Sequence, residues 1–386
     1  IININNHMKK HMYFYAFLVL LFAACGSQPK TQITKSGLDP EKFDSIIDGK
    51  QIGLYTITNS KGVEVCFTNF GGRILSVLVP DKNGEMKDVV LNYDNLASLT
   101  SEASDYGASI GRYANRIKGG VLPIDGDTIQ LPQNNFGHCL HGGVKGWQYQ
   151  VYDVIHQTNN SLTISYKSAD GEENFPGNVE AFVTFTLDED NALHIDYEAT
   201  TDKKTVINMT NHSYFNLTGD PLNPITDHYL YVNADSYTPI DETVITTGEI
   251  LPLKDTPLDF STERKIGTRI DEYDFDQLKF ADGVDHNFVL NTKGDLSQIA
   301  AKIYSEETGI GVEVYTNEPG IQIYTGNFMD GSAIGKKGLP YNKRTGVCLE
   351  TQHYPDSPNK PEWPSVYLNP GETYKSKCIY KFTVKK

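Results

Sequence analysis

A long series of short segments rich in β-branched and aromatic residues is the feature that most restricts how this chain can fold. Each segment is bounded by Gly, Asn, Asp or Pro, as strands and their turns usually are. Examples are residues 52–59, 63–70, 74–81, 149–156, 161–168, 180–188, 192–200 and 299–307. The dipeptides Asn83-Gly84 and Asp125-Gly126 are typical of two-residue hairpin turns. This pattern predicts an all-β protein, built as a large antiparallel β-sandwich or barrel.

Helical patterns are few, with candidates at residues 95–104 and a turn near 268–273. No change in composition divides residues 43–386, so we expect one domain there, with a pair of smaller β domains as the alternative. No internal repeat is visible, and a β-propeller would need repeats on the scale of its blades.

Composition and charge restrict the partners. Hydrophobic residues make up 39% and charged residues 22% of the 386 residues, as in soluble globular proteins. The formal net charge is −15 and no basic stripe is present, which excludes nucleic acid as a partner. The five cysteines show neither a disulfide framework nor a zinc spacing. His138 and His141 could offer two metal ligands, but no further cluster completes a set of four, so we expect no metal.

The N-terminal residues have the order of a secretory signal. A basic region at 8–10 precedes an apolar run at 13–25 that is too short to span a bilayer as a helix. The run ends in Ala-Ala-Cys, which resembles the lipobox of bacterial lipoproteins, with Cys25 as the lipidated residue; an ordinary cleaved signal peptide is the alternative. We therefore expect an exported bacterial lipoprotein that is anchored to a membrane and faces the periplasm.

These features predict three regions of the chain. Residues 1–25 hold upstream residues and the signal peptide, and residues 26–42 form a polar tether that contains Pro and Gly. Residues 43–386 form the folded domain.

The stretch INMTNHSYFNL, residues 207–217, mixes polar residues with residues suited to a core. Read as one strand from residue 206, it places Ile207, Met209 and Phe215 on a mostly apolar face. The opposite face is polar, carries His212, and is expected to contact solvent. The pattern alone leaves open whether His212 is a structural residue or a chemically active one.

A carboxylate has a similar position in residues 345–374. Val347 and Leu349 alternate with Glu350, so Glu350 points away from the apolar pair, near the end of a strand that stops at Pro355. Such a carboxylate is usually a solvated edge charge. The long Pro-rich segment that follows is too long for a tight hairpin. It instead indicates a stiff, ordered loop that forms a wall beside Glu350.

Two Gly-rich segments, 107–117 and 136–147, place glycine on either side of Arg, Asn and His. Glycine allows the backbone to approach a ligand closely. Tyr113 or Trp147 could stack on an apolar face of such a ligand. Each segment alone is a weak indication of a binding site.

Seven motifs, taken in order, resemble the aldose 1-epimerase (galactose mutarotase) family. They are NFGG (69–72), GRYANRI (111–117), LHGG (140–143), TNHSYFNL (210–217), VDHNFVL (284–290), IQIYTGNF (321–328) and CLETQHYPD (348–356). The resemblance covers essentially all of residues 43–386. It implies a galactose mutarotase-like supersandwich with an open groove for a free aldohexose such as glucose or galactose, and a catalytic domain that works without a cofactor.

The resemblance also implies a role for each matching residue. His212 is the general acid that protonates the ring oxygen, and Glu350 is the general base at the C1 hydroxyl. The implied substrate-binding residues are Asn115, Arg116, His141, Asp285 and Gln322. The residue types suit the chemistry, because opening a sugar ring needs two proton transfers by groups that titrate near the working pH. We expect the protein to be a monomer.

Two other functions fit part of the pattern. A glycoside hydrolase would need two carboxylates, which Glu350 and Asp285 could supply. A sugar-binding lipoprotein without activity could use the same sandwich, but its sequence would lack His212 or Glu350, and both are present.

Overall fold

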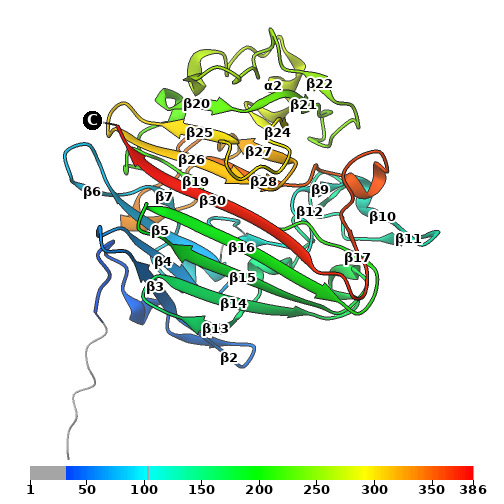
Figure 1. Cartoon of the computed structure of the whole chain (residues 1–386), viewed down its shortest axis with the longest axis horizontal. Helices are drawn as coiled ribbons and strands as arrows, with labels where there is room; N and C mark the ends of the chain where they lie inside the picture. Colours follow the sequence, from blue (N-terminus) through cyan, green and yellow to red (C-terminus); the bar gives the residue numbers. More distant parts are fainter. Residues whose placement is uncertain (1–31, 102–103, 386) are drawn as a thin grey trace, which may run out of the picture.

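Antiparallel strands make up most of the regular secondary structure among the described residues, which confirms the predicted all-β class. The computed structural model describes residues 32–101 and 104–385. The largest sheet has nine strands, with β30 near its middle (Figure 1). In spatial order they are β13 (Asp153–Gln157), β14 (Ser161–Ser168), β15 (Val179–Leu187), β16 (Ala192–Thr201), β30 (Tyr374–Val384), β26 (Ile310–Thr316), β25 (Ala301–Tyr304), β20 (Tyr229–Val232) and β23 (Arg264–Lys265).

Two further sheets provide strands that pack against it. The seven-stranded sheet has the order β22 (Leu251–Pro252), β21 (Ala234–Thr238), β24 (Asp285–Leu290), β27 (Gly320–Tyr324), β28 (Val347–Gln352), β19 (Tyr214–Phe215) and β7 (Val90–Leu91). The four-stranded sheet has the order β3 (Leu54–Thr58), β4 (Glu64–Thr68), β5 (Arg73–Pro80) and β6 (Met86–Asp88). The result is a large β-sandwich, as predicted.

Smaller elements connect and cover these sheets. The two-stranded pairs are β1 (Ser45–Ile47) with β2 (Lys50–Ile52), β10 (Val121–Ile124) with β11 (Asp127–Gln130), β9 (Arg116–Ile117) with β12 (Cys139–Leu140), β17 (Thr205–Val206) with β29 (Tyr367–Leu368), and β8 (Ser109–Ile110) with β18 (Thr210–Asn211). The α-helices are α1 (Leu96–Ser101) and α2 (Asp276–Ala281). Short 3₁₀ turns occupy Pro40–Lys42, Lys118–Gly120, Trp147–Tyr149, Glu172–Asn174, Ile225–Asp227, Ile266–Thr268, Lys336–Gly338 and Ser357–Asn359. Within the described ranges, no helix is long and apolar enough to cross a membrane.

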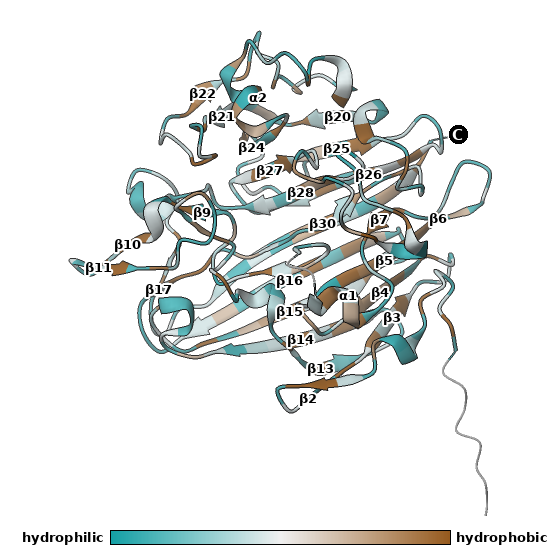
Figure 2. Ribbon diagram, turned by 180° about the vertical axis from the view of Figure 1, so that it is seen from behind, coloured by the Kyte–Doolittle hydropathy of each residue, from teal (hydrophilic) through white to brown (hydrophobic). Residues whose placement is uncertain are grey.

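The core lies between the sheets because their strands alternate in burial. In β15, Val183 and Phe185 are fully buried, whereas Thr184 between them is partly exposed. One continuous cluster of buried apolar side chains joins residues of all three large sheets. Figure 2 shows hydrophobic residues along the strands and hydrophilic residues in many of the outer loops.

The turns and helices agree in part with the sequence pattern. Asp125-Gly126 forms the predicted two-residue turn between β10 and β11, whereas Asn83-Gly84 lies in a longer connection, residues 81–85, between β5 and β6. Helix α1 lies within the predicted range 95–104. Helix α2 was not predicted; Phe275 precedes it and provides no side-chain cap, so the usual start signal of a helix is missing there.

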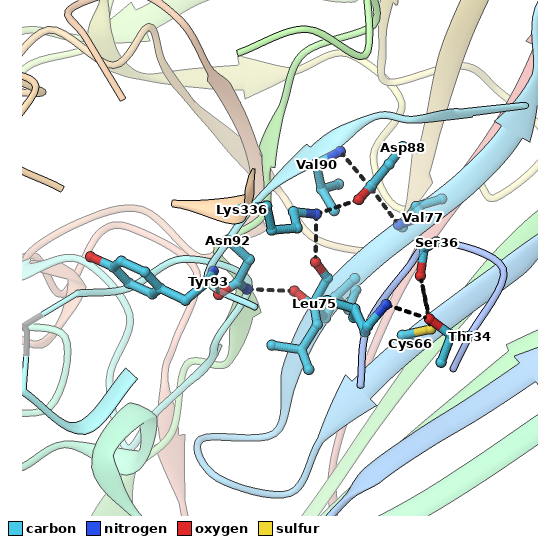
Figure 3. Close-up of polar contacts among 12 residues, drawn as sticks. Thr34, Ser36, Cys66, Leu75, Val77, Asp88, Val90, Asn92, Tyr93 and Lys336 are labelled. Carbon is cyan, nitrogen blue, oxygen red and sulfur yellow. Dashed lines mark hydrogen bonds and ion pairs between the residues drawn. The ribbon is translucent and has the colours of Figure 1, made fainter. Parts of the chain in front are cut away.

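The segment predicted as a tether, residues 26–42, is described from residue 32 onward and packs on the domain. Leu38 is only 2% exposed. The Ser36 hydroxyl lies 3.5 Å from the Cys66 thiol, in the region drawn in Figure 3. The packed structure therefore begins before the predicted domain boundary, while the predicted signal peptide and Cys25 lie outside the described residues.

Residues 206–217 do not form the single strand with a solvent-exposed polar face that the alternation predicted. The segment contains only β18, β19 and the end of β17, and every residue from 205 to 217 is buried. Neighbouring loops cover the segment, and its asparagine side chains donate hydrogen bonds to their backbone carbonyls. Asn211 Nδ2 donates to Gly107 O at 3.0 Å, and Asn216 Nδ2 donates to Thr345 O at 2.9 Å. Because these amides are hydrogen-bonded, polar residues can lie in the interior.

Candidate active site

Strands β24, β27 and β28 place polar side chains on one face of the seven-stranded sheet. The pairing sets Asp285 opposite Tyr324, and Gln322 opposite Glu350. Because side chains alternate along a strand, Leu349 faces the core while Glu350 faces the other way, as predicted. The register therefore brings residues of three separate motifs together.

His212 is held between β18 and β19 by backbone contacts. Its N–H donates to Ala108 O at 2.9 Å, and its carbonyl accepts from the Gly107 N–H at 2.9 Å. Strand β19 then pairs directly with β28. This places His212 Nε2 3.6 Å from Glu350 Oε2.

The third part of the site comes from the loops beside β9 and β12. Asn115 and His141 both have left-handed backbone conformations, with φ of 62° and 51°, which are uncommon for residues other than glycine. The Asn115 N–H donates to His141 Nδ1 at 3.1 Å. A neutral imidazole that accepts at Nδ1 carries its proton on Nε2, so His141 can donate from that nitrogen. The His141 and His212 rings meet edge to face, with 5.2 Å between centroids.

These three parts enclose a cavity of about 350 Å³, a size typical of small-molecule sites. Six of the seven residues predicted for catalysis and binding line it: Asn115, Arg116, His141, His212, Asp285 and Glu350. Gln322 lies behind this wall, where its Nε2 donates to Asp285 Oδ1 at 2.7 Å. Gln322 therefore orients the Asp285 carboxylate.

The cavity has further lining residues for which no role was predicted, although four of them lie within the motifs. These further residues are Asp105, Asn135, Phe136, Leu140, Tyr214, Tyr324 and Phe328. Tyr113 and Trp147, the residues predicted to stack on a ligand, are each only 1% exposed and belong to the hydrophobic core, so that prediction is wrong. The Gly-rich spacing around them reflects close packing: a Cβ on Gly111 would lie 2.1 Å from the Trp147 ring.

Burial changes the acid/base properties of the site. It lowers the pKa of His212, an effect opposed by the Asp105 carboxylate. Burial and the neighbouring Asp285 carboxylate raise the pKa of Glu350 well above its usual range. The two pKa values shift in opposite directions because burial favours the neutral form of each group, the imidazole of His212 and the carboxylic acid of Glu350. Burial also lowers the pKa of His141 to about 3, so that imidazole stays neutral.

Two groups of side chains at or beside this cavity have the ligand types of a metal site. They are Asp105 with His141 and His212, and His212 with Cys348 and Glu350, the ligand atoms within each group lying within 4.8 Å of one another. Both groups contain His212, so a bound metal would block the acid/base pair. His138, considered above with His141, has both ring nitrogens engaged: Nδ1 accepts from the Gly119 N–H at 3.0 Å, and Nε2 is 2.8 Å from Thr243 Oγ1.

The sandwich and the cavity on its seven-stranded sheet define a galactose mutarotase-type fold. The structure of a Caenorhabditis elegans aldose epimerase homologue matches with a TM-score of 0.78 and 30% identity, covering 87% of this chain and 100% of that one. Galactose 1-epimerase from Lactobacillus acidophilus matches with a TM-score of 0.77 and 28% identity, covering 89% and 97%.

Sequence comparison identifies the family. The aldose 1-epimerase family model matches residues 53–381. Human galactose mutarotase is 39% identical over 322 residues, which cover 83% of this chain and 92% of that protein. Aldose 1-epimerase of Escherichia coli strain K12 is 36% identical over 337 residues, which cover 87% and 96%. The chain belongs to the aldose 1-epimerase family.

Proposed function

We propose that the protein is an aldose 1-epimerase that interconverts the α and β anomers of free aldohexoses, glucose and galactose among them. The observation that carries this proposal is the pair formed by His212 and Glu350 at the wall of the cavity. Their facing atoms are 3.6 Å apart. Glu350 Oε2 is buried and has no hydrogen-bond partner among the described residues, so it is available to a substrate hydroxyl.

Ring opening needs one proton to be transferred to the sugar and another to be removed from it. His212 donates its Nε2 proton to the ring oxygen O5, and Glu350 accepts the proton of the anomeric hydroxyl. The C1–O5 bond breaks, and its electron pair goes to O5 while the C1–O1 bond becomes an aldehyde. Each positioned proton transfer contributes about 10²- to 10⁴-fold in rate.

Ring closure reverses these steps after rotation about C1–C2. The O5 hydroxyl adds to the other face of C1 and returns its proton to His212, while Glu350 protonates the new O1. During closure His212 acts as the base and Glu350 as the acid, and both then have the protonation states with which they began. Each group thus reverses on closure the proton transfer that it made on opening.

The other lining residues bind and orient the sugar. His141 donates from Nε2, and Arg116, whose Nε donates to Asn135 Oδ1 at 3.1 Å, supplies a positive charge beside the carboxylates. Asp285, fixed by Gln322, accepts from a sugar hydroxyl. Asn115 contributes indirectly, since its N–H sets the His141 tautomer.

Polarimetry tests the reaction directly. Freshly dissolved α-D-glucose and α-D-galactose should reach their equilibrium rotation faster with micromolar protein than in buffer alone. Unchanged rates with folded protein would refute the proposed function. The rival glycoside hydrolase would instead release nitrophenol from nitrophenyl glycosides, which we expect this protein to leave intact.

We also propose that the protein is a monomeric, exported lipoprotein of a bacterium, anchored through Cys25 and facing the periplasm. The basic residues at 8–10, the apolar run at 13–25 and the terminal Ala-Ala-Cys support this proposal. In a bacterial host, a fatty-acid probe should label the wild type in the membrane fraction but not Cys25→Ser. An unlabelled wild type in the soluble fraction would refute the proposed lipid anchor. Sedimentation of the domain without residues 1–31 would test whether the protein is a monomer.

A further inference from the structure

Asp105 is a carboxylate in the cavity that the proposed reaction does not use. It follows helix α1 in the chain and lines the cavity. Its Oδ1 is buried and, among the described residues, has no hydrogen-bond partner. A buried carboxylate oxygen without a donor loses its hydration with no compensation, so a ligand hydroxyl that donates to it is strongly favoured.

The position of Asp105 relative to His212 indicates which hydroxyl it meets. His212 belongs to two groups of close side chains, one with Asp105 and His141 and the other with Cys348 and Glu350. Asp105 and Glu350 thus both approach His212, but they belong to different groups.

The ring oxygen of a pyranose also has two different neighbours. This oxygen, O5, is bonded to C1, which carries the anomeric hydroxyl, and to C5, which in an aldohexose carries the hydroxymethyl group C6–O6. With His212 at O5 and Glu350 at O1, a second carboxylate close to His212 but not grouped with Glu350 can reach the C5 side of the ring, which carries C6.

We propose that Asp105 is a specificity-determining residue that accepts a hydrogen bond from the C6 hydroxyl and thereby favours aldohexoses over aldopentoses. The inference rests on the proposed function and on the roles assigned there to His212 and Glu350. An aldopentose lacks C6 and leaves Asp105 Oδ1 without a donor, which is the situation in which a hydrogen-bonding site rejects an analogue most strongly.

Asp105 has one competing role that the test must separate. Its negative charge opposes the lowering of the His212 pKa by burial. A purely electrostatic role of this kind would act on O5 protonation in every sugar, whether or not the sugar has a C6 hydroxyl. A contact with O6 acts only on sugars that have that hydroxyl.

The experiment compares three sugars of the same ring configuration by polarimetry: D-galactose, 6-deoxy-D-galactose and L-arabinose. In Asp105→Ala, kcat/KM for D-galactose should fall by about 10- to 100-fold, the range for a hydrogen bond to a charged group. The losses for the other two sugars should be at least tenfold smaller. Asp105→Asn, which keeps an acceptor oxygen, should retain an intermediate rate on D-galactose.

The controls distinguish the possible failures. Asp190→Ala removes an exposed carboxylate in the turn between β15 and β16, and should not change the ratio between the sugars. Equal losses on all three sugars in Asp105→Ala, with thermal unfolding unchanged, would overturn the inference. A wild-type protein that accelerates none of the sugars would refute the proposed function itself.

Discussion

Glu350→Gln separates the charge of the proposed base from its shape. The side chain is 2% exposed, and its Oε2 faces His212 Nε2 at 3.6 Å. Glutamine has nearly the same volume, so the substitution leaves the packing of β28 in place while it removes the group that accepts the anomeric proton.

The expected loss in kcat is about 10²- to 10⁴-fold, the contribution of one positioned proton transfer. At 1.36 kcal/mol for each factor of ten, this corresponds to about 3–5 kcal/mol of transition-state stabilisation. The Michaelis constant should change much less, because the other residues that line the cavity remain.

The same substitution should stabilise the fold, increasingly so as the pH rises. Burial raises the pKa of Glu350, so the folded protein binds this proton more tightly than the unfolded chain does. Its contribution to the free energy of unfolding is present below the unfolded pKa of about 4.3 and is lost as the pH rises towards the folded pKa. Each pKa unit between the two states is worth about 1.4 kcal/mol. Glutamine does not titrate, so the variant avoids this loss.

The assay combines polarimetry on α-D-galactose with thermal unfolding from pH 4 to 8. Glu318→Gln is a matched control, because Glu318 is also buried but pairs with His353 at 2.6 Å and does not line the cavity. It should lose stability and keep its kcat. If Glu350→Gln retains more than a tenth of the wild-type kcat, or shows no gain in Tm over wild type at pH 8, the assignment of Glu350 is wrong.

Three further perturbations test other parts of the site. His212→Asn should lower kcat by about 10²- to 10⁴-fold with the fold intact by circular dichroism, and a variant that keeps more than a tenth of the activity would contradict the acid role. The pH profile of kcat/KM should be bell-shaped, because the acid/base pair works with one proton: at low pH both groups are protonated and at high pH neither is. A profile that stays flat from pH 4 to 10 would exclude the pair. Gly142→Ala should lower both Tm and kcat, since φ is +82° and a Cβ would lie 2.2 Å from Gly111 O, beside His141. Gly137→Ala is its control, with φ of +81° and no atom within 4 Å of the Cβ, and should lower Tm alone.

The sequence predicted the strands well where only one face is buried. Segments such as 161–168 and 180–188 alternate clearly, and both correspond to strands of the nine-stranded sheet. The same rule failed for 206–217, because the neighbouring loops cover its polar side as well. Alternation reports which side chains share a face, but it does not report what lies above that face.

The ordered motifs indicated the residues that line the cavity better than any single pattern. His212 alone was ambiguous, because its approach to Glu350 depends on the pairing of β19 with β28, which the sequence does not state. Asp105 carried no signal, because a single acidic residue in a loop looks like any solvated charge. Gln322 could be placed on the correct face of β27, but its contact with Asp285 depends on a register that the sequence does not state.

Strand β19 has only two residues, yet it links the acid to the strand that carries the base. Proteins open locally at a lower free energy than they unfold, and a link this short offers few hydrogen bonds against such opening. Separation of β19 from β28 would draw His212 away from Glu350 while the nine-stranded sheet stays folded. Inactivation by heat should then precede the loss of secondary structure, and amide hydrogen exchange should report Tyr214 and Phe215 as less protected than the centre of β16.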